Sequence, residues 1–272
     1  MHSHIAQSEQ SLEELVTKAN RTLENLLVFT SLSYLAVNTS KTNYIIFSRV
    51  GKIVNSASIA FENMSLSQVF ENKYLGFYVD NNLSWKKHIN MISSKLARGL
   101  GVMRRLKHVL PLSVLRNIYH TVFHPFIVYG CCIYASNFTS NIKRLQILQN
   151  KALRVLGEFV QYEHTRESFI SFRILNIHQI RDHQAGVFTY QVLNRLSPEY
   201  FRDFLKYNSD YHHHRTRGRG SLVSEVRSTS RSSFAIRNYA VNLWNGFLES
   251  IRESENQFQF KIRLKKFLLS GN

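Results

Sequence analysis

The chain has few cysteines and no long apolar run, and both absences restrict where we expect it. Cys131 and Cys132 are the only cysteines among 272 residues. Adjacent cysteines do not easily reach disulfide geometry, so we expect reduced thiols and an intracellular location, in the nucleus or cytoplasm. No run of 18 apolar residues occurs, and the polar start Met1-His2-Ser3-His4 lacks the apolar core of a signal peptide. We therefore predict neither a membrane-spanning helix nor secretion.

Aspartate is scarce as well, which limits the chemistry that the chain can perform. Its four aspartates are Asp80, Asp182, Asp203 and Asp210, and none has an aspartate neighbour. A two-metal phosphoryl-transfer site needs at least two converging carboxylates. The sequence also lacks a glycine-rich phosphate loop, a Gly-x-Ser-x-Gly turn and a His-Glu-x-x-His helix. We predict no catalytic residue, no metal site and no cofactor.

Positive charge, in contrast, is abundant and unevenly distributed. The formal net charge is +17, and residues 81–160 hold 12 lysines and arginines against one acid, Glu158. A cationic segment of this density favours a polyanionic partner, most plausibly nucleic acid bound through its phosphates. The alternative is a basic protein whose cations are only solvated.

The hydrophobic pattern predicts an α+β fold. A Ser11-x-x-Glu14 capping box begins a helix that should run to about Phe29. Short strands are expected near residues 43–48, 58–62, 67–70 and 74–79. From Leu83 the spacing becomes helical. Helices are expected from Ser84 to Leu106 and over residues 112–123, 140–157, 166–173, 177–195, 198–206, 236–249 and 257–269, with Pro125 interrupting after the second of them.

Residues 207–233 differ from their surroundings because they are basic and contain few apolar side chains. We interpret them as a flexible linker. The adjacent histidines His212-His213-His214 seldom form a closed metal site in a loop, and the Arg-Gly-Arg-Gly sequence that follows better suits a mobile nucleic-acid contact. The predicted segments are residues 1–82, 83–160, 161–206, 207–233 and 234–272.

Several short motifs occur in a consistent order along the chain. They are Asn38-Thr39-Ser40-Lys41-Thr42 before the apolar Tyr44–Phe47, Lys73-Tyr74-Leu75-Gly76-Phe77-Tyr78-Val79-Asp80, Leu83-Ser84-Trp85 and, near the end, Leu243-Trp244-Asn245. This order resembles the end of the palm and the start of the thumb in reverse transcriptases of non-LTR (Jockey-like, LINE-type) retrotransposons. The resemblance implies a small antiparallel palm remnant over residues 1–82, followed by a predominantly α-helical thumb and a C-terminal extension.

The same resemblance implies roles for particular residues. Lys41 corresponds to a lysine near the incoming triphosphate, and Tyr74, Leu75 and Gly76 correspond to the primer grip. A parent enzyme would use Mg²⁺, held by aspartates that this chain lacks. On their own, Lys41 would be a solvated turn lysine and Gly76 a residue at a strand bend.

The cations of two predicted helices are the strongest candidates for a binding role. They are Lys86, Lys87, Lys95, Arg98, Arg104, Arg105, Lys107, Lys143, Arg144, Lys151 and Arg154. They could neutralise the phosphates of an RNA–DNA or DNA duplex without reading its sequence. We therefore predict a reverse-transcriptase fragment that retains template–primer binding surfaces without polymerisation chemistry. The alternative is a non-enzymatic module, derived from such an element, that binds nucleic acid or protein.

Overall fold

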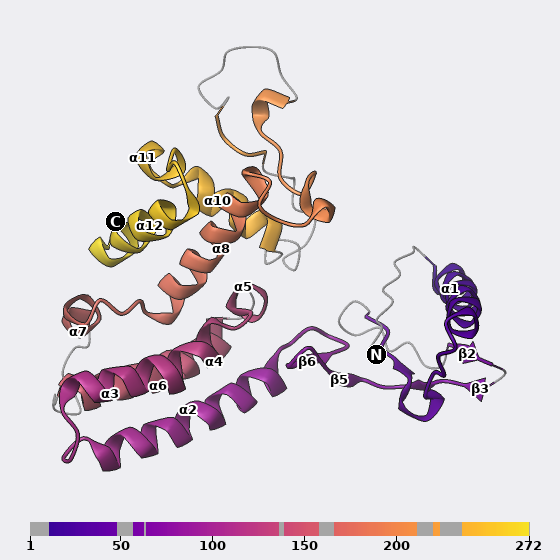
Figure 1. Ribbon diagram of the computed structural model, residues 1–272, viewed down its shortest axis with the longest axis horizontal. Helices are drawn as coiled ribbons and strands as arrows, with labels where there is room; N and C mark the ends of the chain where they lie inside the picture. Colours follow the sequence, from indigo (N-terminus) through magenta and orange to yellow (C-terminus); the bar gives the residue numbers. More distant parts are fainter. Residues whose placement is uncertain are drawn as a thin grey trace. The chain divides into compact units, whose positions relative to one another are not determined.

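The computed structural model confirms the α+β fold class (Figure 1). It describes residues 11–47, 57–62, 64–135, 139–157, 166–210, 220–223 and 236–271. The chain divides into two compact units, Met1–His88 and Ile89–Asn272. All strands labelled in the described residues belong to the first unit, and the second unit is built from helices.

The first unit consists of one long helix over a small core. Helix α1 (Leu12–Leu32) begins where the capping box predicts, because the Ser11 side chain accepts a hydrogen bond from the amide of Glu14 at 3.1 Å. The helix continues three residues beyond Phe29. The buried core comprises Ala57, Ile59, Phe61 and Leu66, against which Val16, Ala19, Leu23, Leu26 and Leu27 of α1 pack.

The strands of this unit form three two-stranded sheets. They are β1 (Asn43–Tyr44), β2 (Ala60–Phe61), β3 (Met64–Ser65), β4 (Ser67–Gln68), β5 (Glu71–Tyr74) and β6 (Phe77–Asp80). The pairs β2–β3 and β5–β6 are antiparallel, as expected, whereas β1 and β4 pair in parallel. The single strand predicted over residues 74–79 is wrong. Leu75 and Gly76 have φ angles of 46° and 84°, so they form a tight turn between β5 and β6.

The helices of the second unit follow the predicted periodicity closely. They are α2 (Lys86–Leu106, whose first turn falls in the first unit), α3 (Leu112–Ile118), α4 (His124–Val128), α5 (Cys131–Tyr134), α6 (Thr139–Gly157), α7 (Arg166–Ser171), α8 (Ile177–Leu193), α10 (Ile236–Asn245), α11 (Glu249–Arg252) and α12 (Gln257–Ser270). Among the helices within the described ranges, none is long and apolar enough to cross a membrane.

Three predicted helix boundaries need correction. The helix expected over residues 198–206 is only a 3₁₀ turn, η3 (Glu199–Phe201), which begins directly after Pro198. Pro125 does not interrupt the chain where expected, because it occupies the first turn of α4, where a missing amide hydrogen is tolerated. The irregularity is instead a π-helical turn, η2 (Tyr119–Phe123), between α3 and α4. The helix expected over residues 236–249 ends at Asn245, and α11 follows it.

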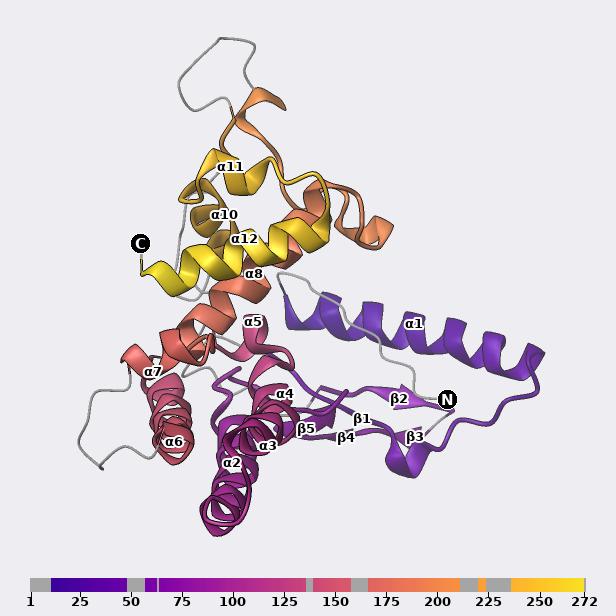
Figure 2. The ribbon, with the colours of Figure 1, turned by 60° about the vertical axis from the view of Figure 1, so that its left-hand side comes forward.

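Helix α2 packs closely against the π-helical turn. Its buried side chains Ile89, Ile92, Leu96, Leu100 and Met103 recur at helical spacing on one side. A Cβ placed on Gly99 would lie 2.8 Å from Val122 Cγ1 and 3.1 Å from Phe123 Cε2. Gly99 therefore permits the close approach. Figures 1 and 2 both show α2, α3 and α6 side by side with nearly parallel axes.

A buried polar network joins α6 to its neighbours. Gln149 is fully buried, and its Nε2 donates to the hydroxyl of Tyr119 and to the carbonyl of Leu175, both at 2.9 Å. Burial raises the pKa of Tyr119 to about 12, and the hydrogen bond from Gln149 opposes part of that rise. One side chain thus connects α6, the π-helical turn and the segment before α8.

Helix α8 is the centre of the C-terminal half. Its Tyr190 stacks on Phe260 of α12, with ring centroids 4.6 Å apart, and Trp244 of α10 stacks on the same phenylalanine at 5.8 Å. Leu222, within the predicted linker, is buried, and its backbone exchanges two hydrogen bonds with the side chain of Asn245. The linker residues 211–219 and 224–233, including His212–His214, lie outside the described residues.

Two glycines of α2 provide a matched test of the close approach. We expect Gly99→Ala to lower the free energy of unfolding by about 1–3 kcal/mol, because the added methyl group meets Val122 and Phe123. A Cβ on Gly101 meets no atom within 4 Å, so Gly101→Ala should raise stability by up to about 1 kcal/mol through helix propensity. Chemical denaturation of the two variants measures both effects. Equal effects of the same sign would contradict the packing described.

A double-mutant cycle tests the buried network. We expect Gln149→Leu to cost about 1–3 kcal/mol, since it leaves buried groups without their hydrogen-bond partner. The cost should fall in a Tyr119→Phe background, because the hydroxyl that accepts from Gln149 is then absent. Tyr190→Phe is the control, since its hydroxyl bonds elsewhere, to the carbonyl of Ser254. Additive effects in both cycles would rule out the Gln149–Tyr119 coupling.

Candidate nucleic-acid interface

Lys41 ends a short turn in front of the first strand. It is the last residue of the 3₁₀ turn η1 (Thr39–Lys41), and its side chain is exposed. Asn38 caps the turn by accepting the amide of Lys41 at 3.2 Å. Two residues further on, the side chain of Asn43 accepts a hydrogen bond from Asn72 at 2.8 Å. The structure therefore connects the segment after Lys41 to the start of the β5–β6 hairpin.

The three primer-grip-like residues form the exposed tip of that hairpin. Tyr74 closes β5, and Leu75 and Gly76 make the turn. The tip is open to solvent, since Tyr74 is 38% and Leu75 65% exposed. A left-handed backbone without a Cβ at Gly76 leaves room for another chain to approach. The hairpin tip therefore has the open geometry that a close backbone contact requires.

Asp80 has a structural role at the end of the hairpin. Its carboxylate accepts from the amides of Ser84 and Trp85 at 3.0 and 3.2 Å, and from the Ser84 hydroxyl at 2.9 Å. These bonds hold the turn that leads into α2. Asp80 is thus a turn residue at the end of a strand.

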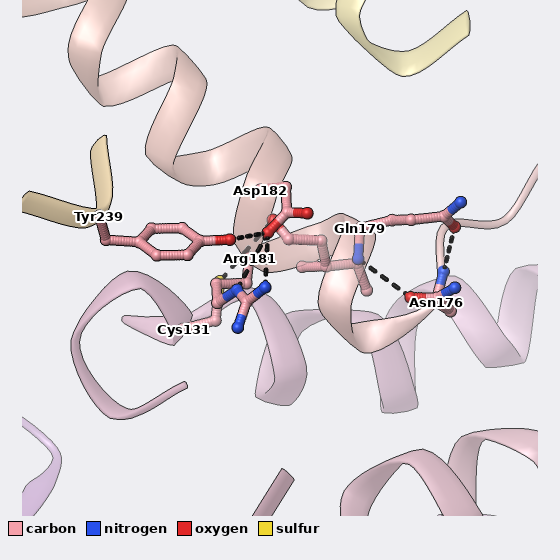
Figure 3. Close-up of polar contacts among 7 residues, drawn as sticks. Cys131, Asn176, Gln179, Arg181, Asp182 and Tyr239 are labelled. Carbon is pink, nitrogen blue, oxygen red and sulfur yellow. Dashed lines mark hydrogen bonds and ion pairs between the residues drawn. The ribbon is translucent and has the colours of Figure 1, made fainter. Parts of the chain in front are cut away.

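Two further aspartates are also engaged in hydrogen bonds within the second unit. Figure 3 shows Asp182 on α8 between the guanidinium of Arg181 and the hydroxyl of Tyr239. Asp182 Oδ1 lies 3.0 Å from Arg181 Nη2 and accepts a hydrogen bond from the Tyr239 hydroxyl. Burial and the adjacent carboxylate raise the pKa of Tyr239, which keeps its hydroxyl a donor. The same figure shows Asn176 and Gln179 in a reciprocal capping box that starts α8. Asp210 accepts the amide of Tyr207 at 2.9 Å.

The described residues contain no cluster of metal-binding side chains. Within the described ranges, no three histidine, cysteine, aspartate or glutamate side chains converge so that they could hold a metal ion. Cys131 and Cys132 are free thiols. The neighbouring Cys132 and burial raise the pKa of the Cys131 thiol, so it is a weak nucleophile.

The cations of α2 lie away from its buried side. Lys86, Lys87, Arg98, Arg104 and Arg105 are exposed, and Lys95 is half-buried, as is Lys107, which directly follows the helix. At about 100° per residue, Lys87, Arg98 and Arg105 fall within about 20° of one another, directly opposite the buried stripe. These three cations of α2 therefore lie on its outer face, whereas Lys86 and Arg104 lie at its flank, about 80° from the centre of the buried stripe.

Helix α6 has the same organisation. Lys143, Arg144 and Lys151 are exposed, and Arg154 is half-buried. The buried side chains Ile142, Leu145, Ala152, Leu153 and Leu156 occupy the other side. Arg144 donates to the side chain of Asn90 on α2 at 2.6 Å, so the two cationic helices are joined at this point.

Some of these cations already have partners within their own unit. Lys87 forms an ion pair with Glu71 of the hairpin. The ammonium group of Lys95 lies 4.5 Å from the ring centroid of Phe126. In the described part of the chain, the exposed cations of the two helices that form no ion pair include Lys86, Arg98, Arg104, Lys143 and Lys151. These five are available for an external anion.

A second group of ionisable side chains was not identified from the sequence. His120, His124, His183, Arg173 and Lys265 line a pocket of about 140 Å³ in the second unit. Burial, followed by the charges of His120, Lys265 and His183, lowers the pKa of His124 to about 4. Burial also lowers the pKa values of His120 and His183. The i,i+4 spacing of His120 and His124 was the available sequence signal, but His183 and Lys265 are brought in only by the fold.

Comparison with known proteins identifies the class to which part of the chain is related. Over 125 residues, 45% of this chain, it is 30% identical to the probable RNA-directed DNA polymerase from transposon X-element of Drosophila melanogaster. Over 130 residues, 47% of the chain, it is 28% identical to the probable RNA-directed DNA polymerase from transposon BS of the same organism. Over 98 residues it is 31% identical to the RNA-directed DNA polymerase from mobile element jockey.

These relatives are much longer than the matched region. The alignments cover 14%, 14% and 11% of their lengths, so the chain corresponds to a small part of each. No protein-family model and no solved structure matches the chain. Over about 45% of its length the chain is thus homologous to RNA-directed DNA polymerases of non-LTR retrotransposons, which confirms the resemblance indicated by the motifs.

The depressed histidine pKa values predict acid-sensitive stability. The pKa of His124 is about 4 in the folded chain and about 6.5 when unfolded, so the unfolded state binds more protons between these values. The stability contributed by neutral His124 is present above pH 6.5 and is lost as pH falls towards 4. Allowing for its partial exposure, we expect about 1–2 kcal/mol from this residue. Urea unfolding measures the free energy of unfolding at pH 7 and at pH 5. Its decrease between these pH values should be smaller in His124→Gln than in the unmodified chain. An equal loss in both proteins would contradict this.

Proposed function

We propose that the chain is a fragment of a retrotransposon RNA-directed DNA polymerase that binds template–primer duplex and carries no polymerisation chemistry of its own. The observation that carries this proposal is the cationic surface of α2 and α6, including Arg98, Arg104 and Lys151, which are exposed and unpaired in the described chain. The homology to transposon polymerases supplies the class of partner.

The dimensions of α2 suit a duplex backbone. Its 21 residues extend about 31 Å at 1.5 Å per residue. This length matches about nine base pairs of a duplex that rises 3.4 Å per pair. Cations placed along one face of such a helix can neutralise several phosphates and release their counterions, so affinity arises without sequence readout.

The absence of polymerisation by the isolated chain is part of the proposal. Of the four aspartates, Asp80 and Asp182 are engaged with amide, hydroxyl or guanidinium donors, and Asp210 accepts a backbone amide. Two-metal catalysis needs carboxylates that converge on the cations. Lys41 and the hairpin tip would then contribute to binding of the duplex, and they would have no role in stabilising a reacting triphosphate.

A second candidate function follows from the same surface. A module released from polymerase function could use these cations to bind another nucleic acid, or an acidic protein. The ion pair between Lys87 and Glu71 supports this candidate, because it is an example of a carboxylate bound by one of these cations. Both a duplex and an acidic protein would bind through attraction to the same cations. The two can be distinguished by the slope of log affinity against log salt and by which of the two ligands binds more tightly.

The salt dependence of duplex binding tests the proposal. We expect the affinity for a fluorescent RNA–DNA hybrid to fall steeply between 50 and 200 mM salt, because bound cations displace condensed counterions. Arg98→Gln and Arg104→Gln should each weaken binding and reduce the slope of log affinity against log salt by about 0.9. Fluorescence anisotropy measures both quantities.

Arg202→Gln is the matched control, because this exposed arginine of the second unit is already paired with Glu199 at 3.2 Å. Its salt slope should equal that of the unmodified chain. An affinity for the hybrid that does not change with salt concentration would refute the proposed interface, as would equal losses of affinity in all three variants.

Primer extension separates binding from chemistry. With a primed RNA template, the four deoxynucleotides and Mg²⁺, we expect the isolated chain to bind the hybrid without adding nucleotides, since its aspartates do not provide a converging pair. An active reverse transcriptase under the same conditions verifies the assay. Template-dependent extension by this chain would overturn the catalytic part of the proposal and leave the binding part intact.

A further inference from the structure

A pocket in the second unit gathers cation-forming side chains from several elements. His120 comes from the π-helical turn η2, His124 from α4 and His183 from α8. Arg173 follows α7, and Lys265 belongs to α12. These residues are distant in sequence, and folding brings them around one volume of about 140 Å³. Gln184 and four aliphatic side chains complete the lining.

Among the described residues, the charges that shift the pKa values of His120, His124, His183 and Lys265 are all positive. Arg116 on α3 and Lys265 both disfavour protonation of His120. Lys265 and Lys261 do the same for His183, whereas the hydrogen bond to the carbonyl of Lys261 favours it. Lys265 itself has a lowered pKa, because of burial and because of Arg116 and Arg173. Gathering these groups without a neutralising anion costs free energy, and an anion in the pocket would recover it.

One ring nitrogen in the lining lacks a partner. His124 Nδ1 is buried and makes no hydrogen bond in the described chain. Buried polar nitrogens are rarely left unsatisfied in folded proteins. Arg173 and Lys265 are hydrogen-bond donors, and each imidazole becomes a donor at both nitrogens when it is protonated, so a ligand that accepts several hydrogen bonds would match the lining.

From the volume, the donors around it and the absence of an acidic side chain from the described lining, we propose that this pocket binds a single phosphate group. The volume holds one tetrahedral anion and part of an attached sugar, and excludes a duplex. A phosphate carries close to two negative charges at neutral pH and presents several acceptor oxygens, which fit one guanidinium, one ammonium and three imidazoles. The source of the group is either free phosphate or the terminal phosphate of an oligonucleotide.

This site is independent of the proposed duplex interface. It is lined by residues of η2, α4, the segment after α7, α8 and α12, and contains none of the candidate cations of α2 or α6. The phosphate would lie within the pocket, where its negative charge favours protonation of the three histidines. The exposed cations of α2 and α6, in contrast, would contact a duplex backbone at the protein surface.

Sulfate binding measured by calorimetry on the whole chain tests the pocket. Sulfate stays dianionic from pH 8 to pH 6, so a change in its affinity reports protons taken up by the protein. We expect affinity to rise as pH falls, by up to about tenfold per pH unit for each histidine that gains a proton on binding. Inorganic phosphate should compete for the same site. An affinity that is constant with pH, or no binding of either anion, would overturn the proposal.

Two adjacent lysines of α12 supply matched variants. Both lysines are exposed to solvent, but only Lys265 lines the pocket. We expect Lys265→Gln to weaken sulfate binding at least tenfold and Lys266→Gln to leave it unchanged. His124→Gln should flatten the pH dependence, and His183→Gln serves the same purpose if the first variant does not fold. Equal affinities in the two lysine variants would refute the site.

Two further comparisons identify the source and separate this site from the duplex interface. A short oligonucleotide with a 5′ phosphate should displace sulfate better than its 5′-hydroxyl form if nucleic-acid ends are the ligand. Equal displacement, with binding of inorganic phosphate retained, assigns the pocket to the free anion. Arg98→Gln and Arg104→Gln should keep full sulfate affinity, so a failure of duplex binding and a failure of this pocket are observed separately.

Discussion

Burial of the apolar side of α2 determines where its cations lie. Five buried side chains, from Ile89 to Met103, each contribute about 1.5–3 kcal/mol, which far exceeds the repulsion between exposed lysines and arginines in water. The helix therefore takes the orientation that its apolar stripe requires, and its charges are carried to the opposite face. Gly99 makes this possible, because any larger residue would separate α2 from Val122 and Phe123. The cationic surface is in this sense a consequence of core packing.

The parts of the fold that the sequence predicted are those controlled by local periodicity. Helices α2, α6, α8 and α12 bury one side or are buried throughout, and their spacing is visible without a structure. The hairpin was misjudged because Leu75, a residue that seldom has a positive φ, shares the turn with Gly76. The π-helical turn at Tyr119 could not be predicted, since its hydrogen bonds depend on contacts with α2 and α6.

For the candidate site, the sequence predicted which cations are exposed but not which are available. Exposure follows from the position of each residue on its helix. The partners of Lys87, Lys95 and Arg144 lie 16, 31 and 54 residues away, and only tertiary structure brings them near. The same reason explains why the histidine pocket was missed. Its residues come from five elements, and no short motif records a cluster of that kind.

Binding and catalysis place different demands on a sequence, and this difference explains how the two can separate. Phosphate neutralisation adds up over many cations, so the loss of one, or its diversion to Glu71 as in Lys87, lowers affinity by a modest factor. A two-metal site needs several carboxylates in a fixed arrangement, and the loss of one removes the function. A polymerase-derived segment that no longer contributes to catalysis can therefore keep a duplex-binding surface for as long as α2 and α6 keep their apolar sides. The residues that fold the second unit also orient its cations, so the exposed cationic surface is retained as long as the core is retained.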